Sequence, residues 1–366
     1  MVQKLYFKKM MTDEDVEKLE SDYLDESFYK KINPQKWNIN TDCDGYDTDG
    51  NLLFIFRKKC LDEDLSDILV DNLRDFSRKT HENRGASAGK LDRKALPKYV
   101  GKLVDAGKFR TGFISSKTGK KSKTKLSNLA PSNIIGYYDK PDRNLLGKGD
   151  KIRKTAFLKN NPDNWENVIP FFQNVDKIYC ESFKDKTPNI YEKQKKRAEL
   201  VKDYVIPKTV FSTATVNYSW RTGIHKDKAN YAGGLAILAV VKDKKNKNNY
   251  EGCGLGFPQY GFVVDIGDRD ILITDNRIGW HGNTEFKSQQ KEILEIDKNK
   301  LPNQRQIDNK WYFNRLSMVM YMRESMIELV NNASLLKNKK NSKKLKQGSL
   351  SVKPKTKKTK KNIKKN

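Results

Sequence analysis

The residues most able to do chemistry are two histidines and one aspartate in the second half of the chain. His225 and Asp227 are separated by one residue, and His281 follows further along. The chain has only three histidines, so this set uses two of them. Two imidazoles and one carboxylate can occupy one face of an octahedral Fe(II) ion and leave the opposite face open for O2 and a cosubstrate. The pattern therefore predicts a metal site typical of non-heme iron oxygenases.

Spacing decides whether these side chains can meet. Side chains two residues apart on an extended segment point to the same side, so His225 and Asp227 would project together. His281 would then come from a second strand. Two histidines and a carboxylate also bind catalytic zinc, although zinc needs a general base and leaves little room for a bidentate cosubstrate. A third alternative is that the histidines are ordinary core or surface residues.

A strand-like segment around residue 315 places a charge on an apolar face. The residues alternate between two faces. One face carries Phe313, Arg315, Ser317 and Val319, and the other, which is apolar, carries Leu316, Met318 and Met320. A buried arginine costs free energy unless an anion meets it. A dicarboxylate cosubstrate would supply that anion, with Arg315 in a bidentate pair and Ser317 adding a hydroxyl donor. The alternative is a structural ion pair with an acid of the chain, such as Asp265.

The segments that would position these residues are short and rich in β-branched and aromatic residues. Turns of Gly and Asp divide them, which is typical of an antiparallel sandwich or barrel. The predicted strands span residues 209–218, 234–242, 250–257, 261–266, 271–275 and 311–323.

The first half of the chain is predicted to be mixed. Thr12 opens a capped helix, and a strand pair at 36–39 and 52–57 is joined by an acidic turn at 42–50. That turn lacks the ligand pattern of a calcium loop. Further helices are predicted over 65–76, from 162, with a kink at Pro170, and over 191–204.

Composition points to a polyanionic partner. The net charge is +27, and residues 337–366 hold fourteen lysines and no acid. Such a tail cannot bury a core and should be disordered, and the body stays basic without it. Both features favour nucleic acid as the partner, although an AT-rich genome would also enrich lysine. The four scattered cysteines and the absence of an apolar membrane span favour an intracellular protein without membrane contact, in the nucleus or in viral or host cytoplasm.

Several motifs in order resemble the TET/JBP family of Fe(II)/2-oxoglutarate dioxygenases, with the nearest likeness to phage, large-virus and fungal members. The matching segments are TVNYSWRTGIHKD at 215–227, GG at 233–234, GFPQYG at 256–261, WHGNT at 280–284 and RLS at 315–317. NRG at 83–85 and IIGYYD at 134–139 resemble N-terminal elements of that branch. The resemblance covers residues 83–326.

The resemblance implies an α+β protein with a double-stranded β-helix, or jelly-roll, core. We expect an N-terminal helical and hairpin extension at 1–79, a dioxygenase domain at 80–330 with its barrel core at about 207–326, and the disordered lysine-rich tail at 337–366. It also implies hydroxylation of the 5-methyl group of 5-methylcytosine or thymine in DNA after the base is flipped out. We expect the protein to be a monomer.

Family roles carry over onto matching residues. His225, Asp227 and His281 would bind Fe(II), while Arg315 and Ser317 would hold 2-oxoglutarate, with O2 as the second cosubstrate. Arg221 would help position the cosubstrate or serve as a structural arginine. Asn230 and Asn83 would contact the substrate, and Asn230 stands where relatives often carry an acid. Its amide can donate to thymine or accept from cytosine, so the target base stays open.

Two further functions remain open. One is a 2-oxoglutarate-dependent hydroxylase of RNA, a nucleotide or a protein. The other is a non-catalytic relative that binds nucleic acid.

Overall fold

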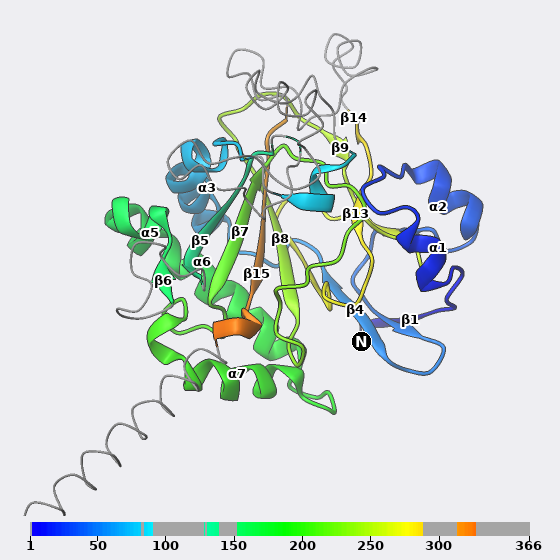
Figure 1. Ribbon diagram of the computed structural model, residues 1–366, viewed down its shortest axis with the longest axis horizontal. Coiled ribbons are helices and arrows are strands. Elements are labelled where there is room, and N and C mark those ends of the chain that lie inside the picture. Colours follow the sequence, from blue (N-terminus) through cyan, green and yellow to red (C-terminus); the bar gives the residue numbers. More distant parts are fainter. Residues whose placement is uncertain are drawn as a thin grey trace, which may run out of the picture.

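The computed structural model describes residues 2–81, 84–90, 128, 130–138, 152–287 and 313–326. Within these residues a nine-stranded sheet faces a four-stranded sheet, and helices cover the outer face of the larger one (Figure 1). The larger sheet runs in the order β1 (Gln3–Phe7), β3 (Cys43–Asp47), β4 (Leu52–Arg57), β12 (Asp270–Thr274), β8 (Ala236–Lys242), β15 (Arg315–Tyr321), β7 (Thr213–Tyr218), β5 (Ser132–Tyr138) and β6 (Arg153–Lys154).

The smaller elements complete this arrangement. The second sheet has the order β13 (Gly282–Asn283), β10 (Leu255–Phe257), β11 (Phe262–Val264) and β2 (Asn38–Ile39), and β14 (Phe286–Lys287) pairs with β9 (Glu251–Gly252). The helices are α1 (Asp13–Glu17), α2 (Glu26–Ile32), α3 (Glu63–Ser77), α5 (Ala156–Asn160), α6 (Pro162–Ser182) and α7 (Ile190–Leu200), with 3-10 turns η1 (Gly85–Ala88) and η5 (Lys202–Tyr204). The mixed α and β architecture agrees with the predicted class and is consistent with a jelly roll.

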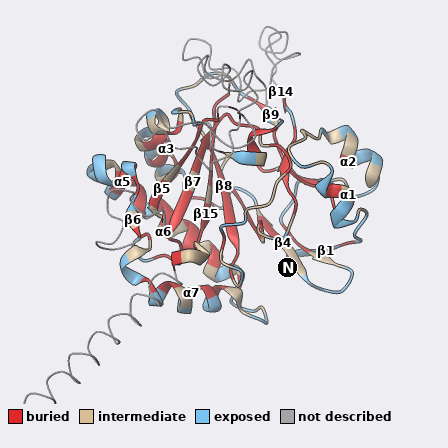
Figure 2. Ribbon diagram, viewed as in Figure 1, coloured by how far each residue is buried: buried red, intermediate tan, exposed pale blue. Residues whose placement is uncertain are grey.

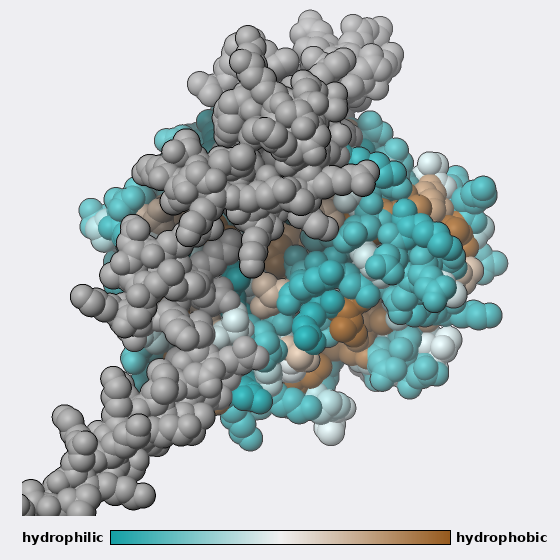
Figure 3. All heavy atoms as spheres, viewed as in Figure 1, coloured by the Kyte–Doolittle hydropathy of each residue, from teal (hydrophilic) through white to brown (hydrophobic). Residues whose placement is uncertain are grey.

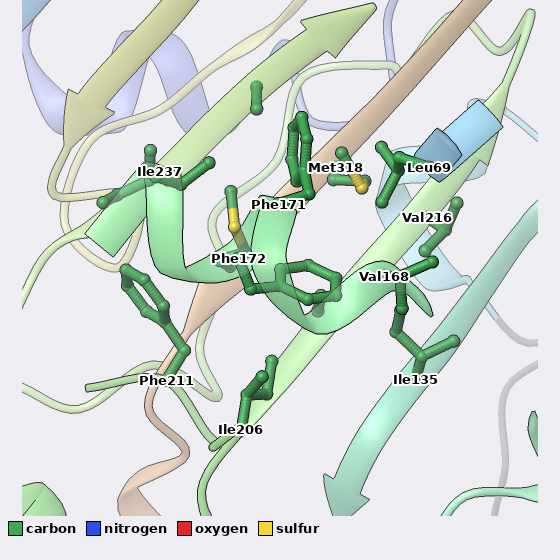
Figure 4. Packing of buried hydrophobic residues seen from close by; sticks show 14 of the residues in the cluster. Leu69, Ile135, Val168, Phe171, Phe172, Ile206, Phe211, Val216, Ile237 and Met318 are labelled. Carbon is green, nitrogen blue, oxygen red and sulfur yellow. The ribbon is translucent and has the colours of Figure 1, made fainter. Parts of the chain in front are cut away.

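The main core lies between the larger sheet and its helices. Val168 and Phe172 of α6 pack onto apolar side chains of the central strands, among them Val216 and Met318 (Figure 4). Figure 2 shows these strands buried while the outer faces of the helices are exposed. Because the apolar face of β15 is occupied by this core, Arg315 and Ser317 must face the opposite sheet.

A second core fills part of the space between the two sheets. Leu238 and Val240 of β8 meet Phe257 and Phe262 of the smaller sheet. This aromatic packing holds the sheets together at one end. The polar side chains of the candidate site line the rest of the space between the two sheets.

The N-terminal strands differ from the sequence prediction. Residues 43–47 of the acidic stretch form a strand, β3, which pairs with β4 and with β1, so the predicted pairing of 36–39 with 52–57 is wrong. Strand β2 instead pairs in parallel with β11 of the second sheet. Strand β4 joins β12, so residues before 80 extend both sheets.

Other predictions about elements are confirmed. Thr12 caps α1 through the backbone N–H of Asp15, and α6 begins at Pro162. The strand-rich region after residue 207 contains β7 to β15, although the predicted strand at 250–257 is split into β9 and β10. No helix in the described ranges is long and apolar enough to cross a membrane. The visible face around α1 and α2 is mainly hydrophilic, with smaller hydrophobic groups between (Figure 3).

Candidate metal centre

The two histidines are fixed side by side by their own backbones. His225 and His281 form an isolated antiparallel bridge, with N–H to O=C distances of 2.9 and 3.0 Å. Their ring centroids are 4.3 Å apart. The backbone N–H of Asp227 donates to the carbonyl of Asn276 at 2.8 Å, which turns its carboxylate toward the rings. One ligand atom from each of His225, Asp227 and His281 lies within 4.8 Å of the others.

Both imidazoles are oriented for metal binding. Nδ1 of His225 lies 2.8 Å from the carbonyl oxygen of Gly223, and Nδ1 of His281 lies 2.9 Å from that of Gly279. A carbonyl can only accept, so Nδ1 carries the proton in each ring and Nε2 presents its lone pair. The Nε2 atoms face the carboxylate oxygens of Asp227 at 3.6 and 3.7 Å. A divalent metal ion fits this set of donors.

Electrostatics keep Asp227 and His281 deprotonated. Burial would lower the pKa of His225, but its hydrogen bond to the Asp227 carboxylate raises that pKa on balance. Burial alone would raise the pKa of Asp227, but the facing imidazoles of His225 and His281 lower it to about 2. Burial and the neighbouring His225 lower the pKa of His281 to about 4. The carboxylate is therefore charged and the His281 ring is neutral at neutral pH, as metal binding requires.

The three side chains line a cavity of about 700 Å³ between the two sheets. Its floor is a row of polar residues across the larger sheet, where Ser132 pairs with Asn217 and Asn217 pairs with Ser317 in the strand register. The Ser132 hydroxyl also donates to the Asn217 side-chain carbonyl at 2.5 Å. Arg315 lines the same cavity at the end of β15.

Arg315 is a buried cation with two guanidinium nitrogens that lack a partner among the described residues. Only 2% of its surface is exposed, and its Nε and Nη2 atoms have no hydrogen-bond partner among the described residues. No ion pair within the described part of the chain joins it to Asp265, so the predicted structural alternative is not observed there. A buried guanidinium in this state is satisfied by a bound anion, and the carboxylate of a keto acid fits.

Tyr250 lies beside this cation, and the sequence analysis missed it. Burial raises the pKa of Tyr250, and the nearby Arg315 guanidinium opposes that rise. The Tyr250 hydroxyl also has no hydrogen-bond partner within the described residues. Tyr250 is not among the residues that line the cavity, so its phenol would meet an anion held by Arg315 only from behind the guanidinium.

The Tyr250→Phe variant should bind the anionic cosubstrate less tightly. Loss of one hydrogen bond to a carboxylate should raise the apparent KM for 2-oxoglutarate by about 10-fold with little change in stability. Tyr29→Phe is the matched control, because the Tyr29 hydroxyl is also buried and unpartnered among the described residues but lies beside Arg221. Steady-state kinetics with varied 2-oxoglutarate measure both variants, and equal KM values would contradict a role for Tyr250.

Arg221 lies elsewhere. Its guanidinium donates to the carbonyls of Asn283 and Leu24 at 3.1 and 3.2 Å and pairs with Asp25 at 2.5 Å. It is not among the residues that line the cavity. This geometry favours the structural alternative for Arg221 over a contact with cosubstrate.

A family model for the oxygenase domain of the 2OGFeDO superfamily, Tet_JBP, matches residues 133–324, more than half of the chain. The chain belongs to the Tet_JBP family. All three candidate ligands and Arg315 lie inside the matched segment. The superfamily is one of Fe(II)- and 2-oxoglutarate-dependent oxygenases, and the donor set and the buried Arg315 guanidinium fit those two groups.

Curated relatives are similar over part of their length. The bifunctional helicase and thymine dioxygenase JBP2 of Trypanosoma brucei brucei (strain 927/4 GUTat10.1) is 32% identical over 161 residues, which are 43% of this chain and 14% of JBP2. The thymine dioxygenase JBP1 of Crithidia fasciculata is 30% identical over 211 residues, 56% of this chain and 23% of JBP1. The chain therefore spans less than a quarter of either relative.

Among solved structures, NgTET1 in complex with 5mC DNA is similar over 86% of this chain and 92% of that chain. The sequence identity is 11% and the TM-score is 0.41. A TM-score this low carries no argument about the present fold.

Asn230 is placed at the cavity of this Tet_JBP chain. It is buried, it lines the cavity, and its Nδ2 atom has no hydrogen-bond partner within the described residues. Its backbone bridges that of Arg323 just after β15. Asn83, the other expected substrate contact, lies outside the described residues, but its neighbour Arg84 lines the cavity.

Tyr321 and Arg323 also line the cavity and were missed from the sequence. They lie on the same face as Arg315, at every second residue along the segment. Extending that alternation past Val319 would have identified them from the sequence. Asn276, two residues after β12, donates its side-chain amide to Asp227. It has no such signal in the sequence, because only folding brings the two residues together.

The cavity wall is strongly cationic. Among its described lining residues, Asp227 is the one acid, against seven cationic side chains: Lys79, Arg84, Arg153, Lys226, Lys228, Arg315 and Arg323. Such an imbalance concentrates the potential of one sign in a cleft and attracts anionic ligands.

Proposed function

We propose that this protein is an Fe(II)- and 2-oxoglutarate-dependent dioxygenase that hydroxylates the 5-methyl group of a pyrimidine in DNA. One observation carries the proposal: three side chains that could hold a metal ion line the same cavity as a buried arginine, whose Nε and Nη2 have no partner among the described residues. Membership of the Tet_JBP family supports the same reaction class. The two facing sheets around the cavity support a double-stranded β-helix as the finer description of the core.

In this proposal the residues of the chain hold the iron and the cosubstrate, orient the metal ligands and shield the cavity from water. His225, Asp227 and His281 hold the iron, and Arg315, Ser317 and Tyr250 hold the distal carboxylate of 2-oxoglutarate. The bound iron, O2 and 2-oxoglutarate together supply the oxidising power for hydroxylation of a methyl group. The Gly223 and Gly279 carbonyls keep both imidazoles in one tautomer and orientation. The apolar packing between the sheets shields one end of the cavity from water.

The charge of the cavity supports a nucleic-acid substrate. A methyl group inside a DNA duplex is reached when its base is flipped outward, and the flanking phosphates then lie near the cavity mouth. Lysines and arginines of the wall would meet those phosphates. We infer that the lysine-rich residues 337–366, which lie outside the described residues, add contacts to the DNA backbone.

Thymine is the first candidate for the target base. The curated relatives JBP1 and JBP2 are named as thymine dioxygenases. The unpartnered Nδ2 atom of Asn230 and the nearby guanidinium of Arg323 are hydrogen-bond donors, and thymine presents two carbonyl oxygens where cytosine presents one and an amino group.

Mass spectrometry of matched oligonucleotides tests the proposal. Duplexes that contain thymine or 5-methylcytosine are incubated with protein, Fe(II), 2-oxoglutarate and O2, and the digested nucleosides are analysed together with succinate. We expect a thymidine product one oxygen atom heavier, formed only when all components are present. RNA, free nucleotides and a peptide are parallel arms. Succinate without a modified nucleoside would contradict DNA as the substrate, and no succinate with any substrate would contradict the dioxygenase.

A further inference from the structure

The loop that carries His225 contacts an N-terminal segment, residues 10–25, that precedes the Tet_JBP match by more than a hundred positions. The backbone N–H of Ser21 donates to the carbonyl of Ile224 at 2.9 Å, and the N–H of Ile224 donates to the carbonyl of Asp22 at 2.9 Å. Gly223 lies so close that a Cβ there would be 2.9 Å from the Ser21 carbonyl oxygen. The residues just before His225 are therefore bonded to the N-terminal segment.

A single side chain of α1 packs against both histidine segments. Val16, which is fully buried, forms an apolar cluster with Ile224 and Trp280. Ile224 directly precedes His225, and Trp280 directly precedes His281. Because the two histidines are bridged through their backbones, one residue of α1 supports both ends of that bridge.

Polar contacts also connect α1 with both histidine segments. Gln259 accepts from the backbone N–H of Trp280 at 3.2 Å and donates to the Asp13 carboxylate at 2.6 Å. Lys226, next to His225, lies over the Trp280 ring at 4.8 Å and 3.8 Å from Asp13.

Two residues before Gly223, the chain is tied to the segment a second time. The Arg221 guanidinium pairs with Asp25 and lies 5.0 Å from the centre of the Tyr23 ring. The Arg221 side chain is 5% exposed, so this pair is shielded on the arginine side.

We propose that residues 10–25 are a positioning element for the metal centre, in which Val16 and the Asp25–Arg221 pair set the place of the two imidazoles. None of these side chains lines the cavity, so they act through His225 and His281 rather than on a ligand. Metal affinity depends on ligand placement within fractions of an ångström, and groups that orient the ligands change it by about 10-fold to 100-fold. The inference rests on the proposed metal site.

The test compares two buried valines in the full-length protein. Val16→Ala and Val168→Ala each remove two methyl groups from a fully buried position, but Val168 packs in the core on the far side of the larger sheet. Co(II) serves as the probe, with affinity from titration and site geometry from its visible absorption. We expect Val16→Ala to weaken Co(II) binding by about 10-fold and to alter the absorption spectrum, with Val168→Ala near wild type. Equal Co(II) affinity in the two variants would overturn the proposal.

A second pair of variants covers the case in which Val16→Ala does not fold. Asp25→Asn removes the half-exposed partner of Arg221, while Glu26→Gln removes the neighbouring acid, which pairs with Lys287 instead. Asp25→Asn should weaken Co(II) binding several-fold and Glu26→Gln should not. Equal affinity in this pair would also contradict the role of residues 10–25. If wild-type protein fails to bind Co(II), the metal site itself is contradicted, which is a separate outcome.

Discussion

Replacement of Arg315 by leucine is expected to weaken binding of 2-oxoglutarate strongly without lowering the stability of the ligand-free protein. The apparent KM should rise by about 100-fold to 1,000-fold, since truncation of one partner of a buried charge pair costs about 3–4 kcal/mol of binding. The ligand-free protein loses only a buried cation whose Nε and Nη2 have no partner among the described residues, and leucine is tolerated in apolar surroundings.

Thermal unfolding with and without 2-oxoglutarate and Mn(II), in the absence of O2, measures both effects. Wild-type protein should gain stability from the ligand, and Arg315→Leu should gain none. Arg74→Leu is the control. Its removal leaves the Asp243 carboxylate, which is 0% exposed, without its closest cationic partner, so the ligand-free protein should lose about 3–5 kcal/mol of stability. A ligand-induced shift that survives in Arg315→Leu would contradict the assignment of the arginine.

Asp227→Ala should remove metal binding and turnover while the protein stays folded and still binds DNA. The carboxylate contributes one of three donors, and its nearest contacts are the two imidazoles and an Asn276 amide at 3.5 Å. The backbone bond from Asp227 to Asn276 is unaffected by the substitution. Stability should therefore change by no more than about 1 kcal/mol.

Co(II) titration, succinate release and fluorescence anisotropy with labelled DNA separate these effects. Asp275→Asn is the control, because Asp275 is a half-buried acid near Asn276 that accepts from the backbone of Arg277 and lies outside the cavity lining. Turnover by Asp227→Ala at the wild-type rate would remove the metal assignment. Loss of DNA binding together with turnover would show instead that the substitution disturbs the fold.

Local sequence pattern was sufficient for much of the candidate site. A spacing of two brought His225 and Asp227 together, and the alternation of β15 placed Arg315 and Ser317 on the cavity side. The adjacency of His225 and His281 had no local signal, because it depends on a backbone bridge between segments 56 residues apart in the sequence. That His281 lies beside His225 was predicted from the family resemblance, in which the matching motifs occur in the same order.

The N-terminal strands show where local pattern fails. The acidic stretch before residue 50 was predicted to be a turn because carboxylates favour solvent. Asp44 is nevertheless buried, since Arg57 and Lys186 pair with it at 2.8 and 2.7 Å. Lys186 comes from a distant part of the chain, and no short window of sequence includes both partners. The choice between the two roles of Arg221 had no local signal for the same reason, because Asp25 is almost two hundred positions away.

The junction between β4 and β12 has a practical consequence for work on this protein. A fragment trimmed to the residues that the family model matches would lack β1, β3 and β4. Strand β12 would then become a bare sheet edge, with unsatisfied amides beside the exposed side chains of Ile271 and Ile273. Edges of this kind recruit other chains, so the shortened protein should self-associate and precipitate where the longer one stays dispersed.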